Sequence, residues 1–176
     1  MFMTLERLWA GWRAMYVNNV ATQPPPEPGV GDGTDPSECL FERLAAADSE
    51  EALILARTDR VFAVMNAYPY TSGHLMIAPI AHEATLAGLT RDDASALMAL
   101  TQDATVALQA AYEPEGINVG INIGRAAGAG IPGHVHVHVL PRWNGDTNFM
   151  TSVAEVRVLP ESLTFSYEKL RAAWPA

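Results

Sequence analysis

The chain contains little cysteine and few basic residues. Its only cysteine, Cys39, excludes an internal disulfide framework and is typical of a protein in a reducing compartment. Eleven basic residues against twenty acidic ones give a formal net charge of −9 at pH 7. This sign opposes nucleic-acid binding through phosphate neutralisation, so we expect no nucleic-acid partner. An anionic substrate would have to be met by local groups.

Long apolar runs are also absent. No run approaches the roughly 20 residues that span a bilayer, so no membrane association is expected. Charged residues such as Glu6 and Arg7 interrupt the apolar pattern at the N-terminus, which does not resemble a signal peptide. These features predict a cytoplasmic protein, and a length of 176 residues suits one domain.

The first 38 residues differ in character from the rest of the chain. Residues 1–22 carry apolar side chains at helical spacing and predict an amphipathic helical arm. Residues 23–38 are rich in proline, glycine and acidic residues, which predicts a flexible connector. We therefore place the compact domain at residues 39–176.

Short runs of apolar and β-branched residues predict the strands of a sheet at residues 52–58, 60–66, 74–80, 117–124, 133–141 and 155–160. A long helix is expected from Thr90, which forms a capping pair with Asp93, until Pro114. A second helix is expected from Glu161 to Trp174. Strand runs separated by one long helix predict an α+β domain on an antiparallel sheet of about five strands.

Three of the five histidines, His134, His136 and His138, stand two residues apart in GHVHVHVLP. In a strand, this spacing places all three imidazoles on one face. The row could be an exposed polar face, a zinc site or a nucleophilic site. No acidic residue lies within five positions before it, which weakens a catalytic zinc site. A neutral imidazole can attack, a neighbouring one can donate a proton, and the small-residue loop 124–130 can bring backbone N–H groups to phosphate oxygens.

The run from His134 to Leu140 resembles the signature of the histidine triad family of nucleotide hydrolases and transferases, in which three histidines alternate with apolar residues. The resemblance extends from residues 65–79 through 117–124 to 141–149, and it is strongest to a bacterial branch that includes diadenosine tetraphosphate phosphorylases. It implies a homodimer of α+β subunits with joined sheets. It also implies an adenosine nucleotide substrate that is cleaved in two steps at an α-phosphate.

The resemblance implies a role for each histidine. His136 would be the nucleophile that forms a covalent nucleotidyl-histidine. His138 would hydrogen-bond the phosphate and assist proton transfer, and His134 would fix the middle ring, partly through its backbone carbonyl. No cofactor is required for such an attack. His74, after Gly73, is a fourth histidine that the family brings near the site.

Six further residues are candidates for substrate binding, five of them by the resemblance and Trp143 by its place directly after the triad strand. Asn66 matches a contact with the ribose hydroxyls, and Asn122 matches an amide that contacts phosphate. At Gly130, where other branches carry a polar side chain, backbone donors would meet the phosphate. Two candidate walls of the base pocket and an aromatic cover complete the set: Val64, Met76 and Trp143. Plain core packing is the more ordinary role for the apolar residues.

A structural zinc site is also implied by the resemblance. Cys39 and Glu42 stand where many relatives carry Cys-x-x-Cys, and His82 and His134 would complete four ligands. A carboxylate in place of the second thiolate departs from the family pattern, so an unmetallated Cys39 is the alternative.

The sequence leaves open which molecule accepts the nucleotidyl group from the histidine. Water would give hydrolysis and inorganic phosphate would give phosphorolysis, with Arg125 and Arg142 as candidate charges for a phosphate pocket. A nucleoside phosphoramidate hydrolase, or a nucleotide-binding or zinc-binding protein without turnover, are the alternative functions.

Overall fold

The computed structural model describes residues 39–147 and 159–175. The expected helical arm at 1–22, the connector at 23–38 and most of the expected strand at 155–160 lie outside these residues. The described elements are, in chain order, α2 (Leu40–Ala46), β1 (Ile54–Arg57), β2 (Val61–Met65), β3 (Leu75–Pro79), α3 (Arg91–Tyr112), β4 (Gly116–Ile121), the 3₁₀ turn η2 (Arg125–Ala127), β5 (Val137–Arg142) and α5 (Leu163–Ala172).

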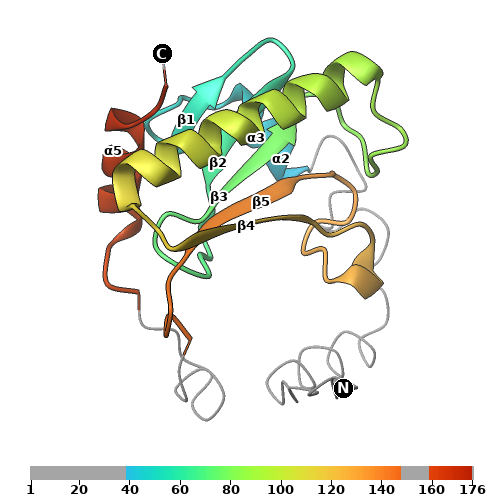
Figure 1. The fold of residues 1–176 in the computed structure, drawn as a ribbon. Coiled ribbons are helices and arrows are strands. Elements are labelled where there is room, and N and C mark those ends of the chain that lie inside the picture. The colour runs from blue at the N-terminus through green and yellow to red at the C-terminus, as the bar shows by residue number, and fades with distance from the viewer. Residues whose placement is uncertain (1–38, 148–158, 176) are drawn as a thin grey trace, which may run out of the picture.

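The five strands form one antiparallel sheet in the order β1-β2-β3-β5-β4 (Figure 1). The α+β class and the antiparallel sheet are therefore confirmed. No helix in the described part of the chain has the length and apolar composition needed to cross a membrane. The cytoplasmic location and the homodimer stay predictions.

The long helix α3 covers one face of the sheet, and α5 packs beside it (Figure 1). The side chain of Thr90 accepts a hydrogen bond from the Asp93 N–H and caps α3, as its sequence predicts. The buried residues of α3 recur at helical spacing, and this helix ends where Glu113 adopts a left-handed conformation before Pro114. This half of the fold follows closely from the sequence pattern.

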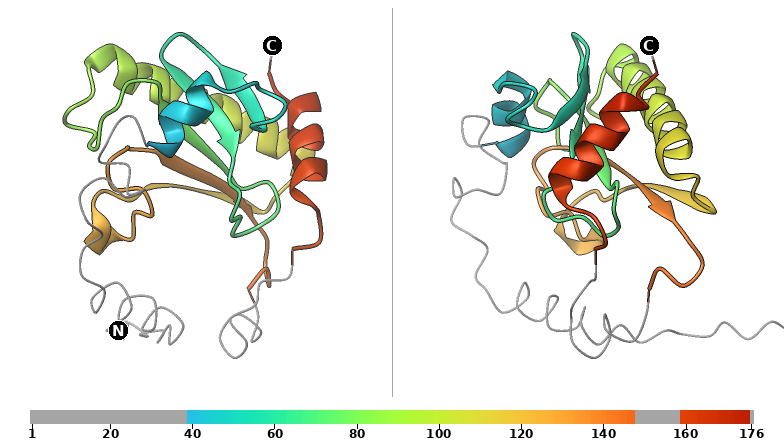
Figure 2. Two further views of the ribbon diagram at one scale, coloured as in Figure 1. Left: turned by 180° about the vertical axis from the view of Figure 1, so that it is seen from behind. Right: turned by 90° about the vertical axis from the view of Figure 1, so that its left-hand side faces the viewer.

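The short helix α2 lies on the opposite face of the sheet, as the right-hand view of Figure 2 shows. Its Phe41 packs there with Phe62, Val64 and Met76 in a second, smaller core. Burying a side chain of this size stabilises the fold by about 2 kcal/mol. Met76 is paired with His138 on β5, so this histidine lies on the same face of the sheet.

The expectation that all three histidines lie within one strand is wrong. Strand β5 begins only at Val137, so His134 and His136 precede it. The hydrogen-bonded ladder between β3 and β5 stops before Pro79, the last residue of β3, because proline has no N–H to donate. The Pro79 carbonyl instead accepts a hydrogen bond from the ring of His134. The Val135 N–H donates to the Glu83 carbonyl at 2.7 Å.

Gly73, directly before His74, is held at a positive φ of 81° against the long helix. A Cβ added here would lie 2.8 Å from Cε2 of Tyr112, a ring whose hydroxyl donates to Glu161. We expect Gly73→Ala to lower the free energy of unfolding by about 2–3 kcal/mol, because it adds a clash to an unfavourable φ. Gly124 has a similar φ of 79° but open space around it.

Gly124→Ala is therefore the matched control, expected to cost only the backbone term of about 1–2 kcal/mol. Urea unfolding of both variants measures the difference. Equal losses would mean that the approach of Tyr112 to Gly73 does not constrain this turn.

Candidate active site

The three triad histidines gather where the chain enters β5. His134 and His136 are only 1% and 3% exposed, whereas His138, inside the strand, is half-buried. The rings of His136 and His138 lie 4.9 Å apart between centroids in an edge-to-face arrangement. Although the strand begins later than expected, the three residues still form a continuous row.

The hydrogen bond to His136 fixes which of its nitrogens is free to react. Its Nδ1 lies 2.8 Å from the backbone carbonyl of His134. Since a carbonyl oxygen can only accept, Nδ1 must carry the proton and Nε2 must hold the lone pair. This tautomer leaves the lone pair of Nε2 available for attack, and the role of nucleophile that the resemblance implies for His136 stays a prediction.

A second chain of hydrogen bonds orients His138. The backbone N–H of Tyr70 donates to Nδ1 of His74 at 3.1 Å, which places the proton of neutral His74 on Nε2. That Nε2–H in turn donates to Nδ1 of His138 at 3.0 Å. Neutral His138 must therefore carry its own proton on Nε2, where it can donate to a substrate oxygen. His74 is fully buried, and its place beside the triad is confirmed.

The site keeps its imidazoles neutral. Burial lowers the pKa of His134 to about 4. Burial, and then the charge on His136, lowers the pKa of His138 to about 4. Burial also lowers the pKa of His136, an effect that its hydrogen bond to His134 partly opposes. At neutral pH Nε2 of His136 therefore retains its lone pair.

Two aromatic rings enclose the four histidines. Phe41, from α2, lies 5.1 Å from His134 and 4.8 Å from His136 between ring centroids, and it is fully buried. Tyr70 packs in a similar way on His74 and His138. Helix α2 is not among the elements predicted from the sequence, although Phe41, Leu44 and Ala45 have helical spacing that could have indicated it.

A cluster of metal-binding residue types lies behind the first histidine. Cys39 Sγ is 3.2 Å from Nδ1 of His134, and one ligand atom from each of Cys39, His82 and His134 falls within 4.8 Å of the others. Because Nε2 of His134 donates to Pro79, its Nδ1 has a free lone pair toward this cluster. Nδ1 of His82 and Oε2 of Glu42 are 3.5 Å apart and buried without a hydrogen-bond partner. A thiolate, two imidazoles and a carboxylate fit the ligand preferences of zinc.

Comparison with known proteins decides the family. Residues 48–145 match the HIT domain. A Mycobacterium tuberculosis protein named AP-4-A phosphorylase is 36% identical over 170 residues, which is 97% of this chain and 85% of the relative. The chain belongs to the HIT domain family.

Solved structures agree with this assignment. A zinc-bound histidine triad family protein from Mycobacterium smegmatis superposes on the HIT protein with a TM-score of 0.64, at 26% identity, over 79% of this chain and 94% of its own. The Plasmodium falciparum diadenosine triphosphate hydrolase, with a TM-score of 0.56 at 16% identity over 72% and 76% of the two chains, shares the fold. The histidine triad resemblance is confirmed, and family membership identifies the protein as a nucleotide hydrolase or transferase.

The two asparagines expected to bind substrate lie at the ends of strands. Asn66 directly follows β2 and is 8% exposed. Its Oδ1 accepts from the Tyr68 N–H at 2.9 Å, and its Nδ2 lies 3.4 Å from both ring nitrogens of His74. Asn122 directly follows β4 and is half-buried. The structure thus joins Asn66 to the histidine network through His74, and the substrate contacts of both asparagines stay predictions.

The expected base-pocket walls share a face with the third histidine. Val64 lies opposite Met76, which lies opposite His138. Because directly opposed residues point to the same face, these side chains form one row. Val64 and Met76 are 1% and 8% exposed and belong to the core around Phe41, so they pack as core residues in the described structure.

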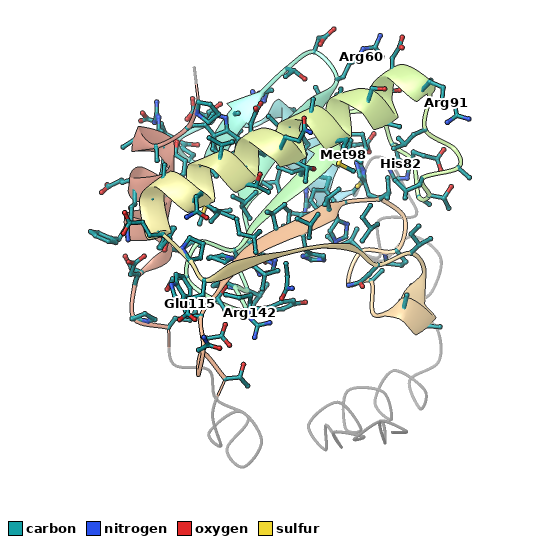
Figure 3. All side chains as sticks on the ribbon, in the orientation of Figure 1. Arg60, His82, Arg91, Met98, Glu115 and Arg142 are labelled. Carbon is teal, nitrogen blue, oxygen red and sulfur yellow. The ribbon has the colours of Figure 1, made fainter. Side chains whose placement is uncertain are left out.

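The remaining candidates lie at the edges of the site. Gly130 is exposed, and a Cβ there would meet nothing within 4 Å. Trp143 packs edge to face on Tyr112, with 6.1 Å between the centroids. Arg142 lies beside Glu115 at the end of the sheet remote from His82 (Figure 3). Its guanidinium makes two bonds to Asp146, at 2.5 and 2.7 Å, so its charge is already balanced.

Proposed function

We propose that this HIT protein cleaves dinucleoside polyphosphates, above all diadenosine tetraphosphate, at an α-phosphate through a nucleotidyl-His136 intermediate. The observation that carries this proposal is the hydrogen bond from Nδ1 of His136 to the His134 carbonyl, which leaves Nε2 unprotonated. The name of the M. tuberculosis relative supports the choice of substrate.

The proposed reaction has two displacements at phosphorus. Nε2 of His136 attacks the α-phosphorus, the bond from phosphorus to the bridging oxygen breaks, and ATP leaves. The positive charge on the substituted imidazole is stabilised by the His134 carbonyl, and His138 donates its Nε2–H to a phosphate oxygen. An oxygen of water or of inorganic phosphate then attacks phosphorus and releases its proton to the medium, the phosphorus–nitrogen bond breaks, and the lone pair returns to Nε2. The nucleophile is a side-chain nitrogen, so this route needs no cofactor.

We propose substrate contacts that follow the placement of the residues. Asn66 would bind the ribose hydroxyls, and Asn122 and the backbone at Gly130 would bind phosphate oxygens. The base would pack against the small accessible surface of Met76 beside the buried Val64, and Trp143, which follows β5, would cover it.

We also propose that a zinc ion is held by Cys39, Glu42, His82 and His134, all of which fit it by donor type and position. A zinc ion with four protein ligands supplies structural rigidity when bound. Here it would hold the backbone of His134, whose carbonyl orients the nucleophile.

Two copies of the chain would associate through the exposed edge strand β4. In the described sheet, β4 pairs only with β5, and most of its residues are exposed. An unpaired edge presents free backbone N–H and C=O groups, so pairing of two β4 strands would join the two sheets of a homodimer.

Product analysis tests the function directly. Purified protein is incubated with diadenosine tetraphosphate, with and without inorganic phosphate, and the nucleotides are separated by chromatography. ATP plus ADP that appear only with phosphate would establish phosphorolysis, and ATP plus AMP without phosphate would establish hydrolysis. Both results support cleavage at the α-phosphate.

Other product patterns would contradict the proposal. Two ADP molecules formed without phosphate would place the cleavage at the central bridge. No product would exclude this substrate, and a panel of nucleoside phosphoramidates would then separate the alternative hydrolase from a protein that only binds nucleotides.

A further inference from the structure

Tyr70, in the loop between β2 and β3, contacts two histidines of the site with its ring. The centroid of the ring lies 4.6 Å from that of His74 and 6.0 Å from that of His138. Its plane is only 21° from the plane of His138, so these two rings are stacked. The backbone N–H of the same residue donates to Nδ1 of His74. Tyr70 therefore contacts the His74–His138 pair through both its backbone and its side chain.

The ring of His138 has neighbours on some sides and, among the described residues, no side chain beside it on another. His74 bonds to its Nδ1, His136 lies against it edge to face, and Met76 is opposite on β3. On β4 the opposite residue is Gly120, where even an added Cβ would meet nothing within 4 Å. A single hydrogen bond at Nδ1 allows the ring to tilt about that bond toward the open side. A stacked aromatic ring opposes this tilt.

Core packing alone is a weak explanation for Tyr70. Tyr70 is 45% exposed and belongs to neither of the two core clusters in the described residues. Tyr68, two residues earlier in the same loop, is 85% exposed and has none of the ring contacts found in the described part of the chain. The described loop thus holds two tyrosines that differ in exposure, and of these two only Tyr70 has ring contacts with the site.

We propose that Tyr70 is a positioning residue for the proton donor His138. Its backbone N–H fixes the ring of His74, and its aromatic face keeps the His138 ring oriented so that Nε2–H points at the phosphate. As negative charge develops on the phosphate oxygens, the hydrogen bond from the His138 Nε2–H strengthens, and the stacked ring keeps this N–H directed at the oxygen. The kinetic consequence rests on the proposed function, whereas the orientation of the ring does not.

Three variants test this proposal. Tyr70→Leu removes the aromatic ring and keeps the backbone N–H, Tyr70→Phe keeps the ring, and Tyr68→Leu is the matched control. With diadenosine tetraphosphate as substrate, we expect kcat of Tyr70→Leu to fall about fivefold, the scale of one aromatic pair, with KM changed less than about twofold. Tyr70→Phe and Tyr68→Leu should keep most of the wild-type kcat.

A spectroscopic measurement separates positioning from a structural role. In nitrogen-15 NMR spectra of the free protein, His138 should show a protonated Nε2 and an unprotonated Nδ1. In Tyr70→Leu the two ring nitrogen shifts should move toward each other as the ring loses its fixed orientation, while the melting temperature changes little. This readout needs no substrate, so it tests the proposal even if the protein does not cleave diadenosine tetraphosphate.

Specific results would overturn the proposal. Unchanged ring nitrogen shifts in Tyr70→Leu would mean that the ring does not orient His138. A rise in KM alone would assign the ring to substrate binding, and an equal loss in Tyr70→Phe would assign the effect to the hydroxyl. An equal loss in Tyr68→Leu would show a general effect of the loop.

Discussion

His136→Ala is expected to lower the turnover of diadenosine tetraphosphate by at least about three orders of magnitude, because removal of a catalytic nucleophile has effects of this size or larger. His138 can still donate a proton in this variant, but no other described side chain presents an unprotonated nitrogen at the position of His136 Nε2. Initial rates from nucleotide chromatography, with phosphate present and absent, measure the loss.

The loss must be separated from unfolding, because His136 is 3% exposed and its ring packs on Phe41. Alanine leaves a cavity there and is expected to cost about 1–3 kcal/mol of stability. His136→Asn is the matched variant, since its side-chain amide can still donate to the His134 carbonyl while lacking a nucleophilic nitrogen. Both variants should show a cooperative melting transition and no turnover.

The covalent intermediate provides a second readout for the same prediction. Phosphorus–nitrogen bonds survive base better than acid, so wild-type protein quenched in base during turnover should carry a nucleotidyl group. Peptide mass spectrometry should place that group on His136, and both variants should lack it. Wild-type turnover in His136→Asn, or an adduct on another residue, would contradict the assignment of the nucleophile.

The sequence predicted much of the fold because its signals are local. Capping by Thr90 and the periodic apolar residues determined α3, and short runs of apolar and β-branched residues determined most strands. Local signals were weaker at the two places where the prediction differed. Helix α2 is too short for a clear period, and β5 begins late because Pro79, on the neighbouring strand, ends the ladder.

The identity of the triad residues could be predicted, but their protonation could not. The spacing of His134, His136 and His138 is written in seven consecutive residues. The tautomers depend on contacts between distant segments, such as the bond between His74 and His138, which are 64 positions apart. The contact of Cys39 with His134 spans 95 positions. Only the folded structure shows that His136 donates to a backbone carbonyl, whereas His138 accepts a hydrogen bond from the ring of His74.

Zinc is expected to raise the melting temperature of the wild-type protein by about 5–10 °C when its free concentration is about 100 times the dissociation constant. At that excess, binding of zinc to the folded state adds about 2.7 kcal/mol to the free energy of unfolding. Each kcal/mol shifts the melting temperature of a protein of this size by about 2–4 °C. Calorimetry after chelation, and again after addition of zinc, measures the shift. Elemental analysis should find one zinc ion per chain.

Two variants identify the ligands. Cys39→Ala should abolish the zinc-dependent gain, and Glu42→Gln should reduce it, because an amide is a much weaker ligand than a carboxylate. Glu51→Gln, which removes an equal charge from an exposed position outside the cluster, should keep the full gain. An unchanged melting temperature on addition of zinc to the wild type, or a full gain in Cys39→Ala, would contradict a metal site here.

His134 makes the zinc prediction relevant to catalysis. Its Nδ1 faces Cys39, while its carbonyl accepts a hydrogen bond from the protonated Nδ1 of His136. A bound metal would therefore restrain the backbone that orients the nucleophile, without contacting the substrate itself. Chelation should consequently lower kcat severalfold and leave residual turnover, whereas removal of His136 leaves none. Complete loss of activity on chelation, with the fold intact, would instead mean that the metal takes part in the reaction.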